Sequence, residues 1–338
     1  MKPTVFVFAI GLLAGLIEPA RFVHAADAPD SIMNVSYDVS RELFGQLNPV
    51  FIKQWRDKTQ QTIDIKQSHG GSSSQARAVL EGLRADEVTF NQVVDVQVLH
   101  DKGNLIPADW QKRLGNNSSP FYSLPVFLVR KGNPKNIKDW DDLVRSDVQP
   151  VFPNPKTSGN GRYTYLAATA FALDKFAGDK VKAQDFVKKI IANVPVFDTG
   201  GRASTTTFAQ RGIGDVLITF EAEAFSARRE LGEDKFESVT PSQSLLAGFP
   251  VTVVDKVVDQ RGSRALATAY LEFLYAPEAQ DIIARNYYRV LDPTVAKKYA
   301  AHFPPVKLLS IDTLGGWDNI AKEYLAPGGV LDQVFAGR

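Results

Sequence analysis

Short apolar and β-branched runs alternate with segments of helical periodicity along most of this chain. Strands are predicted at residues 32–37, 63–67, 87–90, 126–130, 148–152, 194–197, 215–220, 236–239 and 250–254. Helices are predicted after most of these strands, and the C-terminal part is largely helical, including 265–275 and 278–286. Strands and helices that alternate at such short intervals are typical of a doubly wound α/β sheet.

Three predicted helices begin in loops rich in glycine and serine, at 68–75, 154–162 and 198–208. Ser72 and Gln75 have the spacing of a capping box, and Ser158 is the expected N-cap of the second helix. A helix N-terminus carries free N–H groups and a partial positive charge, which favour an anion. One such loop is weak evidence, because most bind only water. Three of them, each after a strand, indicate a shared site beyond the carboxyl ends of the strands.

The chain has 338 residues and a net charge of +1. This length accommodates two domains, and this charge gives no reason to expect nucleic acid or an anionic membrane surface as a partner. Around Gly115–Pro120 the composition becomes polar, which suggests a crossing between domains. We therefore expect residues 28–118 and 245–338 to form lobe I, and residues 119–244 to form lobe II.

The N-terminus has the pattern of a secretory signal peptide. Lys2 is followed by an apolar run from Val5 to Ile17, and then by Val23, His24 and Ala25, a small-residue cleavage pattern. The apolar run is too short to span a membrane. We predict a signal peptide at 1–25, with cleavage after Ala25 or Ala26, and an exported, soluble mature protein.

The residues give little support for catalysis, a metal or a cofactor. There is no cysteine, and the histidines of the mature chain, His69, His100 and His302, are too scattered to suggest a metal site. His69 lies in a glycine loop and could touch a ligand, although a surface or structural role is the commoner outcome. Glu221 and Glu223 could be an acid–base pair, but solvated or salt-bridged carboxylates are commoner. No spacing suggests a nucleophile and its base, so we expect no enzyme.

Several blocks of sequence resemble the periplasmic sulfate- and thiosulfate-binding proteins of ABC importers. They run in order over essentially the whole mature chain, at 34–43, 67–72, 126–135, 154–159, 211–218 and 286–289. The blocks at 90–93, 99–110, 117–122 and 197–202 are closer to the thiosulfate-binding branch.

The resemblance implies an α/β, two-lobed periplasmic binding protein, similar to type II, that closes by a hinge on a dehydrated oxyanion in the interlobe cleft. Backbone N–H groups and hydroxyls at helix N-termini would hold the anion, without a directly paired cation. Ser72 and Ser158 would each offer an N–H and a hydroxyl. The implied ligand-binding residues are Ser72, Ser158, Gly159, Asn160, Gly201 and Phe220. Residues expected to support the site from further away are Ser36, Asp38, His69, Gly71 and Arg202.

Three positions depart from the sulfate-binding branch. Asn160 stands where glycine is usual, and Gly201 replaces a frequent alanine, but both keep their N–H donors. Phe220 replaces a tryptophan whose indole N–H would donate to a sulfate oxygen. The missing bond to a charged acceptor is worth about 1.5–3 kcal/mol, and an aromatic face suits the soft sulfur of thiosulfate. Phe220 therefore favours or tolerates thiosulfate; without the resemblance, core filling is the better explanation.

The resemblance thus implies a monomeric periplasmic subunit that captures thiosulfate or sulfate and delivers it to an inner-membrane ABC permease. One alternative is a receptor for another tetrahedral oxyanion such as molybdate. A second is a sulfur-transfer or anion-processing enzyme that uses Glu221 or Glu223, although the usual persulfide-carrying cysteine is missing. A third is a purely structural exported protein, which would close on no anion.

Overall fold

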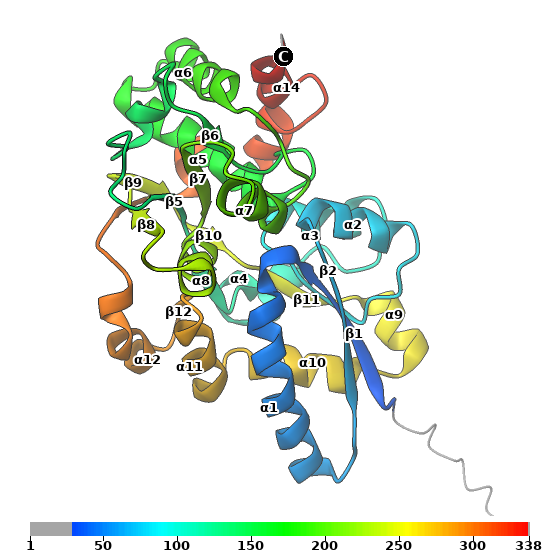
Figure 1. Cartoon of the computed structure of the whole chain (residues 1–338). Helices are drawn as coiled ribbons and strands as arrows, with labels where there is room; N and C mark the ends of the chain where they lie inside the picture. Colours follow the sequence, from blue (N-terminus) through cyan, green and yellow to red (C-terminus); the bar gives the residue numbers. More distant parts are fainter. Residues whose placement is uncertain (1–28, 337–338) are drawn as a thin grey trace, which may run out of the picture.

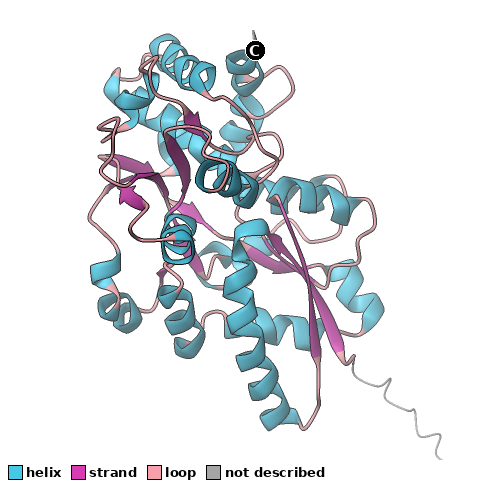
Figure 2. Cartoon of the chain, in the orientation of Figure 1, coloured by secondary structure: helices cyan, strands magenta, loops and turns pink. Residues whose placement is uncertain are grey.

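The computed structural model describes residues 29–336, which form two lobes of strands flanked by helices (Figures 1 and 2). The signal peptide predicted at 1–25 lies outside the described residues. Among residues 29–336, no helix combines the length and the apolar character needed to cross a bilayer.

Lobe I is built on a four-stranded sheet of order β11–β3–β1–β2. Strands β1 (Ser31–Tyr37), β2 (Asp64–Gly70) and β3 (Glu87–Thr89) are parallel, and β11 (Val251–Val253) is antiparallel to β3. Its helices are α1 (Arg41–Thr59), α2 (Ser72–Leu80), α3 (Val93–Asp101), α9 (Asp255–Arg261), α10 (Arg264–Phe273), α11 (Pro277–Arg285) and α12 (Pro293–Lys298). Because the parallel strands end at one edge, the loops that lead into α1, α2 and α3 meet there.

Lobe II is built on a second four-stranded sheet, of order β6–β7–β5–β8. Strands β6 (Pro150–Val151) and β7 (Val216–Phe220) are parallel, whereas β5 (Pro125–Arg130) is antiparallel to β7 and to β8 (Phe236–Val239). Its helices are α5 (Gly159–Lys175), α6 (Lys180–Asn193), α7 (Gly201–Ala209) and α8 (Glu221–Leu231).

The strand predicted at 194–197 does not form. This segment is a loop, because Pro195 cannot donate a ladder hydrogen bond and Phe197 is engaged by other aromatic rings. The Phe197 ring packs against Phe152 and Phe335, with centroid distances of 5.3 and 5.0 Å. Tertiary packing thus prevails over the local apolar pattern.

Two smaller sheets lie where the chain passes from one lobe to the other. One has the order β10–β4–β12, from β10 (Ala247–Gly248), β4 (Phe121–Ser123) and β12 (Arg289–Val290). The other pairs β9 (Gln243–Leu245) with β13 (Lys307–Leu309). The remaining short helices are α4 (Gly115–Ser118), α13 (Gly316–Asn319) and α14 (Val330–Phe335), with 3₁₀ or π turns at Asp38–Ser40, Trp110–Lys112, Trp140–Val144, Ala300–His302, Ile311–Leu314 and Ile320–Tyr324.

The C-terminal segment packs on lobe II, so the prediction that all of 245–338 belongs to lobe I is wrong for residues 307–335. Helix α14 contacts α6, as Figure 1 shows at the top of the view. Lys180 pairs with Glu323 at 2.7 Å, and the Trp317 ring lies 6.0 Å from that of Tyr163 in α5. These long-range contacts leave no local signal in the sequence.

Candidate anion-binding site

The N-termini of α2, α5 and α7 meet across the seam between the lobes. A Cβ atom built on Gly71, just before α2, would lie 2.6 Å from the carbonyl oxygen of Thr157 and 3.1 Å from that of Thr199. These two residues precede α5 and α7. A Cβ atom on Gly201, the first residue of α7, would lie 2.9 Å from Nδ2 of Asn160 in α5. The structure therefore brings together the three glycine-opened helices that the sequence predicts.

Ser72 is fully buried, and its hydroxyl has no partner among the described residues. The predicted capping box is wrong, because α2 begins at Ser72 itself and Gly71 is the N-cap. The Gln75 amide instead donates to the Ser68 hydroxyl at 2.9 Å and to the Ser36 carbonyl at 3.3 Å. A buried, unpaired hydroxyl costs about 1–3 kcal/mol. A ligand that accepts a hydrogen bond at Ser72 would remove this cost.

At the start of α5, Ser158 is the N-cap, as predicted; its hydroxyl accepts from the Gly161 N–H at 3.4 Å. The Ser158 N–H, however, donates to the Asn154 carbonyl at 3.0 Å. The expectation that this N–H faces an anion is therefore wrong, and only the hydroxyl hydrogen of Ser158 is left to donate. The N–H groups of Gly159 and Asn160 are in the first helical turn, where no intrahelical acceptor exists.

The Asn160 side chain connects α5 to the end of β7 and lies over the start of α7. Its Nδ2 atom donates to the Thr219 hydroxyl at 2.9 Å. Because a Cβ on Gly201 would approach the same Nδ2 atom, glycine at 201 makes room for asparagine at 160. Asn160 and Gly201 are both buried. The N–H of Gly201 lies in the first turn of α7, where it has no intrahelical acceptor.

Phe220 ends β7 and is fully buried. Its ring centroid lies 5.8 Å from that of Tyr163 in α5 and 5.0 Å from that of Phe249. The ring therefore fills the core, which is the role expected when the family resemblance is left aside. It also lies at the end of β7, next to α5. Phenylalanine offers no hydrogen-bond donor at this position.

Both arginines at the helix starts of lobe II are paired with carboxylates of lobe I. Arg162 lies 2.5 Å from Asp95, and Arg202 lies 2.7 Å from Glu42. The Arg202 N–H also donates to the Asp38 carboxylate at 3.0 Å. These guanidinium charges are therefore compensated within the protein. The donors left at the junction are backbone N–H groups and hydroxyls.

Two further predicted residues, Ser36 and His69, make contacts within lobe I, whereas Asp38 accepts from Arg202 of lobe II. The Ser36 hydroxyl donates to the Thr89 carbonyl at 3.1 Å, and the His69 ring lies 3.4 Å from the Tyr37 carbonyl. Burial lowers the pKa of His69, which favours the neutral ring. Burial also raises the pKa of Asp38, although the Arg202 N–H acts in the opposite direction. Their expected role as supporting residues stays a prediction.

Two residues just after β3, separated from it by Phe90, were not among the predicted site residues. The Gln92 amide donates to the Gly159 carbonyl at 3.4 Å, and the buried Asn91 Oδ1 has no partner among the described residues. A Cβ atom on Gly159 would lie only 1.9 Å from this oxygen. Both residues lie just beyond the carboxyl end of a parallel strand, where ligands usually bind, and this position could have identified them from the sequence.

Glu221 and Glu223 lie in the first turn of α8 and are buried in separate pairs. Glu221 accepts from Arg289 Nε at 2.8 Å and Nη2 at 3.1 Å. Glu223 accepts from the Thr205 hydroxyl at 2.6 Å and lies 3.5 Å from Arg202. Burial raises the pKa of Glu223 to about 7. Both carboxylates are thus salt-bridged, which was the expected commoner outcome.

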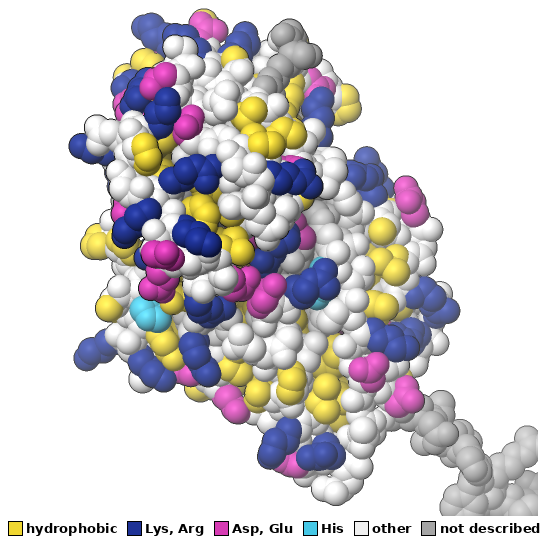
Figure 3. All heavy atoms as spheres, in the orientation of Figure 1, with side chains coloured by type: hydrophobic (Ala, Val, Ile, Leu, Met, Phe, Trp, Pro, Cys, Tyr) yellow, Lys and Arg dark blue, Asp and Glu magenta, His cyan; other side chains and the backbone are white. Residues whose placement is uncertain are grey.

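The surface drawn in Figure 3 carries basic and acidic side chains interspersed over both lobes, without a broad patch of one sign on this face. Together with the net charge of +1, this arrangement gives little long-range attraction for an anion. The free donors at the helix junction would therefore act on an anion only at short range.

The family model described as bacterial extracellular solute-binding protein matches residues 40–289. The chain belongs to this family. It is 57% identical to the thiosulfate-binding protein of Escherichia coli K12, over 90% of this chain and 91% of the relative. It is 51% identical to the thiosulfate-binding protein of Pseudomonas aeruginosa, over 98% of each chain.

The sulfate-binding protein of Escherichia coli K12 is 52% identical, over 90% of this chain and 92% of the relative. Among solved structures, the sulfate-binding protein SubI of Mycobacterium tuberculosis matches with a TM-score of 0.78 and 34% identity, covering 86% of this chain and 98% of that one. These solute-binding proteins confirm the predicted two-lobed fold and the resemblance on which that prediction rested.

Proposed function

We propose that this chain is the periplasmic solute-binding subunit of a sulfate/thiosulfate ABC importer. It captures thiosulfate or sulfate between its lobes and releases the anion to an inner-membrane permease. The signal peptide at 1–25 directs export, and the mature protein acts as a monomer without a catalytic step. The relatives that cover nine-tenths of the chain are named as thiosulfate- and sulfate-binding proteins, which supports this assignment.

The observation that carries the proposal is the unpartnered, buried Ser72 hydroxyl at the junction of three helix N-termini. The anion would accept hydrogen bonds from Ser72, from the Ser158 hydroxyl, and from the N–H groups of Gly159, Asn160 and Gly201. Helix N-termini favour negative charge, and the two nearby arginines are already neutralised by lobe I carboxylates. The site therefore compensates the ligand's charge with the dipoles of helix N-termini, N–H groups and hydroxyls, and not with an unpaired cationic side chain.

Phe220 supports thiosulfate as a preferred or equal ligand. Sulfate presents four oxygen acceptors, each of which gains from a donor, whereas thiosulfate replaces one oxygen with a weakly accepting, polarisable sulfur. A donor-free aromatic ring costs thiosulfate less than it costs sulfate. Molybdate, a larger tetrahedral oxyanion, is the alternative ligand.

The test is a calorimetric titration of anion-free mature protein with thiosulfate, sulfate and molybdate in chloride buffer. We expect micromolar or tighter binding of thiosulfate, with sulfate equal or weaker. In Ser72→Ala, loss of a bond to a charged acceptor should weaken binding about 10- to 150-fold. Thr59→Ala, whose hydroxyl donates to the Trp55 carbonyl at the C-terminal end of α1, should bind normally. Failure to bind either sulfur oxyanion refutes the proposal, and tighter molybdate binding would support the alternative.

A further inference from the structure

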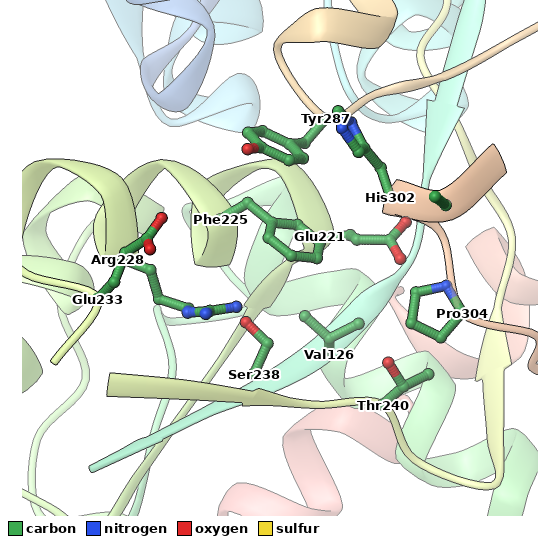
Figure 4. Close-up of a pocket in the computed structure, with 11 residues that line it drawn as sticks. Val126, Glu221, Phe225, Arg228, Glu233, Ser238, Thr240, Tyr287, His302 and Pro304 are labelled. Carbon is green, nitrogen blue, oxygen red and sulfur yellow. The ribbon is translucent and has the colours of Figure 1, made fainter. Parts of the chain in front are cut away.

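A cavity of about 360 Å³ lies at the seam between the lobes (Figure 4). One part of its wall comes from lobe II, through β5, α8 and β8. The other part comes from Tyr287, Ala301, His302 and Pro304, which accompany lobe I. The lining includes none of the residues assigned above to the anion. Its volume is within the range of small-molecule pockets.

Three buried polar atoms on this wall have no hydrogen-bond partner among the described residues. They are Nε of Arg228, Oγ of Ser238 and Nδ1 of His302. Arg228 also forms no ion pair with any residue of 29–336. Figure 4 shows its guanidinium beside the Ser238 hydroxyl. Buried polar atoms without a partner are uncommon in folded proteins, and three around one cavity indicate a missing partner.

The wall between these polar groups is aromatic. The rings of Phe225 and Tyr287 stack at a centroid distance of 4.5 Å and an angle of 14°, and the His302 ring lies 5.0 Å from that of Tyr287. Tyr287 has a φ of 63° because it directly follows the C-cap of α11, and its N–H donates to the Ala284 carbonyl at 3.0 Å. The end of this helix therefore fixes the position of the Tyr287 ring on the cavity wall.

Among residues 29–336, Arg228 has no ion-pair partner; its charge acts on Glu237, which is itself paired with Lys131, and its guanidinium lies 5.9 Å from the Phe225 ring centroid. Glu221 is paired with both Arg289 nitrogens, so its charge is balanced, and Glu233 is exposed to solvent. A carboxylate matches an arginine Nε and a neighbouring hydroxyl, because it can accept from both at once. A flat apolar body would then lie against Phe225 and Tyr287, with His302 available to a second polar group.

We infer that this cavity binds a small organic carboxylate with a flat or aromatic body, separately from the inorganic anion. The two lobes each supply part of the wall, so an occupant contacts both. Such a ligand favours the relative arrangement of the lobes in which these contacts exist. Binding there is therefore linked to lobe closure, and by reciprocity to the affinity for the anion.

The test uses benzoate as the probe and full-length mature protein, with binding followed by nuclear magnetic resonance titration. Benzoate should bind saturably, and benzyl alcohol, which lacks the charge, should bind much more weakly. Arg228→Gln should weaken benzoate binding at least tenfold, since it removes a charge-assisted bond. Arg229→Gln is the matched control, because this neighbour is largely exposed and does not line the cavity; it should change binding less than twofold.

Thiosulfate titration of Arg228→Gln separates a local effect from misfolding, since the anion site should retain its affinity in this variant. Ser238→Ala should weaken benzoate binding several-fold and serves as the second variant if Arg228→Gln is unstable. The inference is overturned by absent saturable binding, by equal binding to wild type and Arg228→Gln, or by competition of benzoate with thiosulfate for one site.

Discussion

Replacing Gly71 by alanine tests whether contact between the lobes is part of anion binding. The backbone of Gly71 (φ −55°, ψ 128°) suits alanine, so the substitution causes no strain within lobe I. The added methyl group would instead lie 2.6 Å from the Thr157 carbonyl oxygen and 3.1 Å from that of Thr199. Both oxygens are backbone atoms of lobe II, which cannot rotate away as a side chain would. The clash therefore acts on the closed arrangement only.

Overpacking by one methyl group costs about 1–3 kcal/mol. If this whole cost falls on the closed, anion-bound form, the affinity for thiosulfate drops about 5- to 150-fold. Calorimetry with thiosulfate measures this effect, and urea unfolding of the anion-free protein measures the stability of the separate lobes. We expect a large loss of affinity with little change in the unfolding of the anion-free protein.

Two other glycines provide controls. Gly45→Ala, in α1, meets no atom within 4 Å and should bind thiosulfate normally. Gly161→Ala would place its methyl group 2.2 Å from the Pro153 carbonyl, inside lobe II, and should therefore destabilise even the anion-free protein. If Gly71→Ala behaves like Gly161→Ala, or binds thiosulfate as the wild type does, the reasoning from lobe contact is wrong.

Three further substitutions test separate parts of the site. Phe220→Trp introduces an indole donor and should raise the affinity for sulfate relative to thiosulfate about tenfold; an unchanged ratio of the two dissociation constants would refute the role of Phe220. Arg162→Gln breaks the interlobe pair with Asp95 and should speed thiosulfate dissociation at least tenfold in stopped-flow measurements, because the buried carboxylate loses its charge partner. For Glu223, the folded protein holds its proton up to a pKa of about 7, against 4.5 unperturbed, so the free energy of unfolding should fall as pH rises from about 4.5 to about 7. Urea unfolding of Glu223→Gln across this window should show a weaker decrease, and an identical slope would contradict the raised pKa.

The features predicted correctly from the sequence are those that neighbouring residues determine. The N-cap role of Ser158 follows from its own hydroxyl and the glycine beyond it, and the three glycine-opened helices follow from strand–loop–helix order. The capping box at Ser72 failed because Gln75 found tertiary partners in Ser68 and Ser36. The Ser158 N–H was likewise taken by a turn to Asn154 that residue type alone does not reveal.

Long-range packing explains the remaining differences. The lobe assignment of the C-terminal segment depends on where the partly buried rings of Trp317 and Phe335 pack, and nothing near them in the sequence indicates lobe II. Asn91 is similar, since its importance comes from the approach of Gly159 across the seam. Residues that matter only when two lobes meet are difficult to identify from either lobe's sequence.

The distribution of charge bears on how a chain of net charge +1 would hold a divalent anion. The arginines nearest the site, Arg162 and Arg202, reach across the seam to Asp95 and Glu42 and so hold the lobes together instead of neutralising the ligand. In the proposed site, the ligand's charge is left to the N–H groups and hydroxyls of α2, which belongs to lobe I, and of α5 and α7, which belong to lobe II. Neither lobe alone then holds a complete set of donors. Under this proposal, closing the ion pairs and completing the anion's hydrogen bonds are one event, and reopening the seam would both separate the donors and readmit water, as release to a permease would require.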